Sequence, residues 1–181
     1  MPFLKLLCIL NTMTIMLPKI DFAFKLLFGD LRSKNILVDF LKAVLPELAD
    51  EEFEVITIAD PHLRREFSGD KLEILDIKIR TASGKIIDIE IQISDLPEMR
   101  SRISYYLSNM ITEQIGKGGH YSELKQVICI VITDYDFIPE TQRCHTVFRM
   151  LEKDEYFPFN GLMEINVLNL ERLPADEEGK L

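Results

Sequence analysis

Apolar residues recur with helical spacing in three segments of the chain. The first covers 22–28 and follows Asp21, a residue type that caps helix starts. The second covers 34–45, where apolar side chains return every three or four positions. The third covers 97–115 and keeps its apolar residues on one face, until the glycine-rich residues 116–119 end it. We therefore expect three helices, the last with one side packed on a sheet.

Alternating or continuous apolar runs predict the strands. Turn residues at 81–84 join two of these runs into a hairpin. The run 126–133 is nearly all apolar, which is typical of a central strand covered on both faces. Residues 146–151 suit a short helix or a strand. The predicted strands are 54–58, 71–80, 85–93, 126–133 and 162–170. The order of elements is then ααβββαβ with a β tail, which predicts an α/β fold.

The length of 181 residues, with 47% hydrophobic and 28% charged residues, is typical of one globular domain with a sizeable core. We interpret residues 1–16 as a leader or a mis-assigned start, because they make a poor signal peptide. Residues 17–174 are expected to form the domain. We interpret residues 175–181 as an acidic C-terminal end that is frayed or truncated. No apolar run reaches the length of a membrane-spanning helix.

Charge and cysteine usage narrow the chemistry. The formal net charge of -9 excludes a protein held to nucleic acid by a broad positive field, so any contact with DNA must be local or metal-assisted. Cys8, Cys129 and Cys144 are odd in number and lack metal-site spacing, which favours thiols in a reducing cytoplasm. The three histidines are scattered as well. Metal chemistry in this chain would belong to carboxylates.

Two acids fall on the same face of the predicted hairpin. If the hairpin is symmetric about Ser83, Asp76 lies directly across from Glu90, with Cβ atoms about 4.5 to 5.5 Å apart. Carboxylates at that separation repel by about 3 kcal/mol at an effective dielectric constant of 20, so the pair favours a bound cation. Oxygen ligands suit Mg²⁺ or Mn²⁺, which can support phosphodiester hydrolysis. The alternative is a solvated face with polar residues at random, because a one-residue shift of register removes the pairing.

Four blocks of the sequence follow a known pattern. The hairpin carries Leu75-Asp76-Ile77 and Ile89-Glu90-Ile91-Gln92, and the other blocks are Leu17-Pro-Lys-Ile-Asp-Phe-Ala-Phe-Lys-Leu-Leu-Phe-Gly29, Arg102-Ile-Ser-Tyr-Tyr106 and Gly118-Gly-His-Tyr-Ser-Glu-Leu124. The hairpin resembles the D...(D/E)-x-K signature of the PD-(D/E)XK nuclease superfamily in its glutamine-bearing form. Together the blocks resemble the Rpn family of recombination-promoting nucleases and putative transposases. This resemblance implies a restriction-endonuclease-like αβββαβ core with a mixed central sheet flanked by helices.

The resemblance also implies roles for individual residues. Asp76, Glu90 and Gln92 are the implied catalytic residues, and the implied metal ligands are Asp76 and Glu90, with Ile91 as a further metal-binding candidate. Gln92 stands where the superfamily usually has a lysine, so a positive charge is missing. The candidates for supplying that charge or an auxiliary acid are Asp21, Lys25, Glu66 and Lys78. The candidates for contacts with DNA phosphates are Arg64, Arg65, Arg100 and Arg102.

The resulting hypothesis is a Mg²⁺- or Mn²⁺-dependent DNA endonuclease associated with recombination or transposition. Its partner would be DNA, its location the cytoplasm rather than a membrane, and two copies could pair as a homodimer. The competing hypothesis is a nuclease-like remnant that binds nucleic acid or protein without cutting. The missing lysine and the net acidity favour this second hypothesis.

Overall fold

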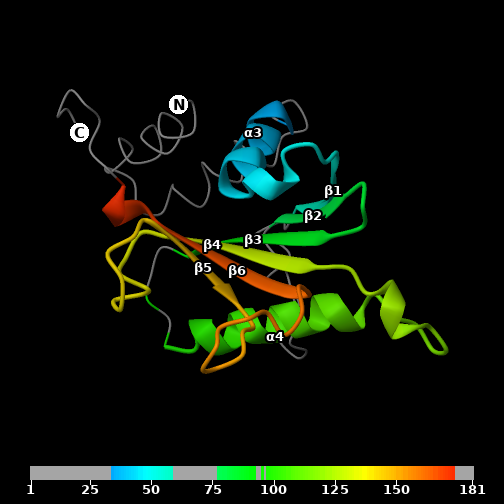
Figure 1. Ribbon diagram of the computed structural model, residues 1–181. Coiled ribbons are helices and arrows are strands. Elements are labelled where there is room, and N and C mark those ends of the chain that lie inside the picture. The colour runs from blue at the N-terminus through cyan, green and yellow to red at the C-terminus, as the bar shows by residue number, and fades with distance from the viewer. Residues whose placement is uncertain (1–33, 59–76, 93–94, 96, 174–181) are drawn as a thin grey trace, which may run out of the picture.

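The computed structural model describes residues 34–58, 77–92, 95 and 97–173, with the side chains of 55–58 left aside (Figure 1). The helix expected at 22–28 lies outside this part of the chain. The described residues form a mixed sheet with helices on both faces, as predicted for the fold class. None of the described helices is long and apolar enough to cross a membrane.

Six strands form the sheet, in the order β1-β2-β3-β4-β6-β5. Neighbours from β1 to β3 are antiparallel, β3, β4 and β6 are parallel, and β5 is antiparallel to β6. Parallel neighbours such as β3 and β4 need a crossover connection, which helix α4 provides. The strands are β1 (Phe53–Ile58), β2 (Ile77–Thr81), β3 (Ile86–Gln92), β4 (Val127–Thr133), β5 (His145–Arg149) and β6 (Met163–Asn169). The helices are α3 (Lys34–Val44), α4 (Met99–Thr112) and the short 3-10 turns η2 (Pro46–Leu48), η4 (Tyr121–Glu123) and η5 (Leu170–Arg172).

Helix α3 covers one face of the sheet (Figure 1). Its apolar stripe packs on the alternate β3 residues Ile87, Ile89 and Ile91. Burying each such side chain contributes about 1.5–3 kcal/mol, which is enough to fix the helix on the sheet. The stripe consists of Leu37, Phe40, Leu41 and Val44, as its spacing predicted.

Helix α4 lies on the opposite face (Figure 1). Its buried residues Met99, Ile103, Tyr106, Leu107 and Met110 pack against the other side of β3 and β4. Strand β4 is buried along its whole length, which confirms the prediction of a central strand covered on both faces. A charged side chain on the α4 side of β3 is therefore enclosed between a helix and a sheet.

Two boundaries differ from the predictions. Helix α4 ends at Thr112, before Ile115, because the chain turns there and reaches Gly118 in a left-handed conformation with φ of 90°. Of residues 146–151, expected as a helix or a strand, 146–149 belong to strand β5, and Leu151 forms only an isolated bridge with Pro158. The segment 146–149 is a strand because it pairs with the free edge of β6.

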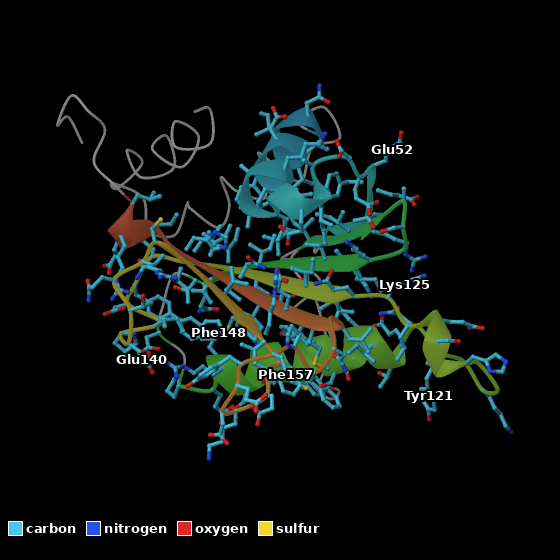
Figure 2. The ribbon with its side chains drawn as sticks, in the orientation of Figure 1. Glu52, Tyr121, Lys125, Glu140, Phe148 and Phe157 are labelled. Carbon is cyan, nitrogen blue, oxygen red and sulfur yellow. The ribbon has the colours of Figure 1, made fainter. Side chains whose placement is uncertain are left out.

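Most of the exposed large apolar side chains lie on or just after β5. They are Val147, Phe148, Met150, Leu151, Tyr156, Phe157 and Phe159. Figure 2 shows Phe148 and Phe157 on the opposite side of the molecule from Glu52, which precedes β1. Glu90 on β3 is separated from this apolar edge by β4 and β6.

A tight turn sets the register of the β2–β3 hairpin. The amide of Gly84 donates to the carbonyl of Thr81, and Gly84 adopts φ of 90°. Beyond the turn, Ile77 pairs with Ile89 and Lys78 with Asp88, so each residue lies as many positions before Ser83 as its partner lies after it. This is the symmetric register that the sequence predicted.

Replacing Gly84 by alanine should weaken the turn and lower the free energy of unfolding by about 1–2 kcal/mol, because a Cβ disfavours a left-handed backbone. The added Cβ would also lie 3.3 Å from Cγ of Lys125. Urea unfolding followed by circular dichroism measures the change. The matched control is Gly161→Ala, whose Cβ would meet nothing within 4 Å. Equal stability of the two variants would contradict this account of the turn.

Candidate functional site

Strand β3 buries two carboxylates under helix α4. Asp88 and Glu90 alternate with Ile87, Ile89 and Ile91, so both acids point to the face that α4 covers. Their exposed fractions are 0% for Asp88 and 1% for Glu90. The alternative of a solvated polar face is therefore wrong for this strand, because the helix excludes water from it. Burial of two like charges so close together demands compensating groups.

Asp88 lies beside the buried thiol of Cys129. The two residues are register partners on β3 and β4, and Cys129 Sγ lies 3.5 Å from Asp88 Oδ2, as a donor to that oxygen. Burial raises the pKa of the Cys129 thiol well above its usual value, and the charges of Asp88 and Glu90 raise it further. Cys129 is thus held as a neutral thiol that donates to Asp88.

Glu90 faces the guanidinium group of Arg102 on α4. Arg102 Nη2 lies 3.6 Å from Glu90 Oε2, which makes an ion pair. Arg102 Nε donates to the hydroxyl of Tyr106 at 2.7 Å, and the guanidinium lies 5.3 Å from the centre of the Tyr106 ring. Burial, and next the charge of Glu90, raises the pKa of Tyr106. Arg102, Tyr106 and Glu90 therefore form one connected group.

Lys78 lies directly across the hairpin from Asp88, but its amino group forms an ion pair with Glu113 at the end of α4. The side chain of Lys78 is only 15% exposed. This contact directs the positive charge of Lys78 toward the carboxyl end of the helix. The auxiliary role predicted for Lys78 stays a prediction.

Gln92 and Ile91 end strand β3. Gln92 is partly exposed, lies on the α4 side and pairs in register with Thr133 of β4. The side chain of Ile91 is buried in the core under α3, on the other face. Only its backbone carbonyl could therefore serve as the metal ligand that the resemblance implies. Gln92 is the group that lies next to Glu90 on the same face of β3.

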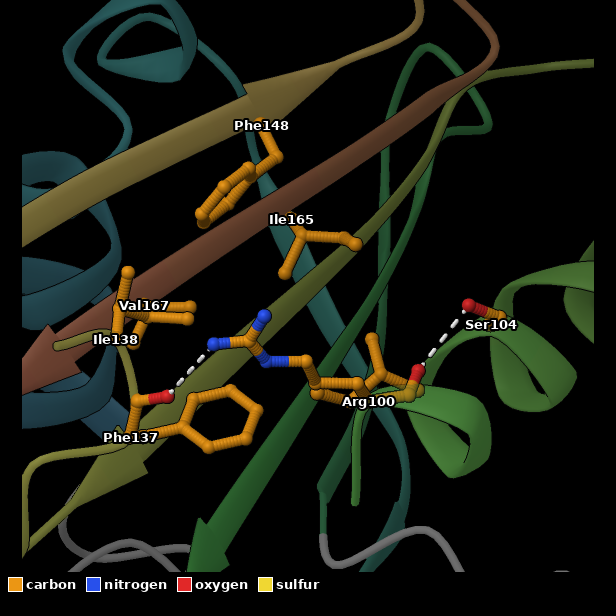
Figure 3. Close-up of a pocket in the computed structure, with 8 residues that line it drawn as sticks. Arg100, Ser104, Phe137, Ile138, Phe148, Ile165 and Val167 are labelled. Atoms are coloured by element: carbon orange, nitrogen blue, oxygen red, sulfur yellow. Dashed lines mark hydrogen bonds between the residues drawn. The ribbon is translucent and has the colours of Figure 1, made fainter. Parts of the chain in front are cut away.

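Arg100 lies two residues before Arg102 on α4, and its side chain points toward Phe137 (Figure 3). It lines an apolar hollow of about 170 Å³ between α4, β5 and β6. Its guanidinium donates to the Phe137 carbonyl at 3.3 Å and to both carboxylate oxygens of Glu140 at 3.1 Å. The side chain remains 58% exposed, so its predicted contact with DNA phosphates stays a prediction.

Six predicted site residues lie outside the described part of the chain. They are Asp21, Lys25, Arg64, Arg65, Glu66 and Asp76. Of the predicted set, the structure brings together Glu90, Gln92 and Arg102 and places Lys78 at the margin of the group. Arg100 and the side chain of Ile91 are directed away from it.

Asp88 is the residue that sequence reasoning missed as a candidate. Its position two residues before Glu90 was a usable signal, because the two must share a strand face. The ion pair between Arg102 and Glu90 had a weaker signal. Helical spacing puts Arg102 one turn before Tyr106, but it does not say which strand residue lies opposite.

The donor set fits a hard divalent cation. Asp88 and Glu90 offer carboxylate oxygens in an enclosed setting. The sulfur of Cys129 beside Asp88 is a neutral thiol and not the thiolate that binds zinc. Within residues 34–58, 77–92, 95 and 97–173, no three His, Cys, Asp or Glu side chains gather closely enough to hold a metal ion. A complete ligand set would thus need water, substrate or a residue outside these ranges.

The buried position of Cys129 predicts its reactivity. In the native protein we expect iodoacetamide to modify Cys129 roughly 100-fold more slowly than Cys144, because Cys129 reacts only after local opening of the sheet. Peptide mass spectrometry at pH 8.5 measures both rates. In urea the two rates should become similar. Equal rates in the native protein would contradict the enclosed arrangement of Asp88 and Cys129.

Comparison of the sequence with known proteins identifies its family. The family model of the PD-(D/E)XK nuclease family transposases matches residues 18–180. No curated protein and no solved structure matches this chain significantly. The matched region covers the sheet, both helices and the paired acids of β3. The chain therefore belongs to the PD-(D/E)XK nuclease family transposases.

Proposed function

We propose that this protein is a divalent-metal-dependent DNA endonuclease that hydrolyses phosphodiester bonds during recombination or transposition. The observation that carries the proposal is the burial of Glu90 on the α4 face of a hairpin with symmetric register. Family membership supports nuclease chemistry. The net charge of -9 means that DNA would be held by local groups and the metal rather than by a broad positive surface.

The register supports the predicted pairing of acids. The last described rung of the hairpin joins Ile77 to Ile89. One further rung of the same ladder would join Asp76 to Glu90, and Asp76 itself lies outside the described residues. In this proposal the two carboxylates lie on the same face, about 4.5 to 5.5 Å apart at Cβ. That separation suits two ligands of one cation.

Glu90 and Asp76 would hold Mg²⁺ or Mn²⁺, with the backbone carbonyl of Ile91 as a further ligand. A bound divalent cation supplies Lewis-acid polarisation of the phosphate and a lower pKa for water. Gln92 lies next to Glu90 on the same strand face, where its amide can accept a hydrogen bond from the attacking water and donate one to a phosphate oxygen. The attacking water would give one proton to solvent as its oxygen bonds to phosphorus, the bond from phosphorus to the 3′ oxygen would break, and that leaving oxygen would take up a proton from solvent.

Removing either carboxylate should abolish cleavage. We expect Asp76→Ala and Glu90→Gln each to lower the rate of supercoiled plasmid nicking in Mn²⁺ by roughly 100-fold or more, because each removes a ligand and a charge. Gel electrophoresis of plasmid over time measures the rate. Glu123→Gln is the matched control, since Glu123 is exposed in η4.

The same assay separates the two hypotheses. Nicking by the wild type that disappears in both variants supports the endonuclease. Supercoiled plasmid that persists in Mg²⁺ and Mn²⁺, with a folded protein that still binds DNA, would instead support a non-cutting binding module. Equal nicking by wild type and Asp76→Ala would point to a contaminating nuclease and contradict the proposal.

A further inference from the structure

The proposed site lacks the positive charge that the superfamily's lysine would provide. Gln92 occupies that position and its amide carries no charge. Negative charge on the phosphate increases as the new bond forms, so a nuclease needs a cationic group near Glu90 and Gln92.

Strand β2 and helix α4 carry four cations, Lys78, Arg80, Arg100 and Arg102. Arg80 is exposed and pairs in register with Ile86 near the hairpin turn, and Lys78 and Arg100 are bound to other groups. Lys78 forms an ion pair with Glu113 at the far end of α4. Arg100 is bound to Glu140 and the carbonyl of Phe137 (Figure 3). The guanidinium of Arg102 lies 3.6 Å from Glu90. Arg102 is therefore the described cation nearest to the proposed metal ligand.

Arg102 is held in place by the helix that carries it. Its Nε is fixed by the Tyr106 hydroxyl at 2.7 Å, and Tyr106 is itself only 7% exposed. The backbone amide of Arg102 donates to the Glu98 carbonyl in the first turn of α4. The side chain of Arg102 is still 34% exposed, so its guanidinium can be reached from solvent, while the side chain of Glu90 beside it is buried. These contacts orient a charged group in advance of binding.

We propose that Arg102 supplies the positive charge that Gln92 does not, and that it contacts the phosphate group during hydrolysis. This inference rests on the proposed nuclease function. A guanidinium group stays charged at all working pH values, so Arg102 donates hydrogen bonds to phosphate oxygens and transfers no proton. Tyr106 is the positioning residue for Arg102. The fold thus places on a helix the charge that related nucleases carry on the strand.

A double-mutant cycle tests whether Arg102 and position 92 share one task. We expect R102Q to lower the nicking rate at saturating Mn²⁺ about 100-fold. Q92K should restore the rate of R102Q by at least about tenfold, yet change the wild type by less than about threefold, because one charge suffices. R143Q, at an exposed arginine of the loop before β5, is the control and should keep the wild-type rate. If Q92K changed both backgrounds by the same factor, the inference would be wrong.

Metal affinity gives a readout that does not depend on cleavage. Arg102 competes with a cation for Glu90, so R102Q should bind Mn²⁺ about 3- to 10-fold more tightly than wild type. The dependence of the melting temperature on Mn²⁺ concentration measures this affinity. An affinity equal to that of R143Q would overturn the inference. If the wild type cut no plasmid, the nuclease proposal would fail while this measurement still decided whether Arg102 acts on the metal site.

Y106F is a second variant for the case that R102Q does not fold. It leaves the charge of Arg102 next to Glu90. It removes only the hydroxyl that holds Nε. We expect the nicking rate to fall about tenfold, with unchanged KM for DNA and unchanged Mn²⁺ affinity, because orientation and not charge is lost. A wild-type rate in Y106F would contradict the role of Tyr106 as positioning residue.

Discussion

The cost of burying carboxylates inside an apolar sheet governs this structure. Strand β3 places Asp88 and Glu90 between a sheet and a helix, where an uncompensated charge costs several kcal/mol. Each acid has a different compensating neighbour. Asp88 has the neutral thiol of Cys129, and Glu90 has the guanidinium of Arg102. Helix α4 therefore does more than cover the sheet. It also carries Arg102, whose positive charge offsets the cost of burying Glu90.

The same constraint connects stability to chemistry. Here the nitrogen and oxygen atoms of Arg102 and Glu90 lie 3.6 Å apart, which is longer than a direct hydrogen bond. Arg102 is therefore a cationic neighbour of the buried Glu90. In the proposed nuclease, a divalent cation would bind next to this guanidinium.

Much of the fold could be predicted from the sequence, because its signals are local. The stripe of α3, the apolar run of β4 and the turn at Gly84 each follow from spacing or from a backbone conformation that favours glycine. The symmetric hairpin register followed from the position of that turn. The end of α4 and the conformation of β5 could not be predicted as well, since both depend on contacts with distant segments.

Glu90 and its neighbour Gln92 could be predicted as site residues from the sequence, but the residues that surround them could not. Alternation in β3 showed that Asp88 and Glu90 share a face, while only the packing of α4 shows that this face is buried. The two arginines of α4 looked equivalent in sequence. In the structure, Arg100 turns to Glu140 and Arg102 to Glu90, because positions two residues apart point to different sides of a helix.

In the proposed nuclease, Glu90 beside Arg102 binds a divalent cation together with Asp76. Crystals soaked in Mn²⁺ and measured at the manganese absorption edge test it most directly. The account predicts an anomalous peak within about 2.2 Å of carboxylate oxygens of both Glu90 and Asp76, on the α4 side of the hairpin. Carboxylates of Asp76 and Glu90 on opposite sides of the sheet, or a manganese peak bound away from Glu90, would contradict it.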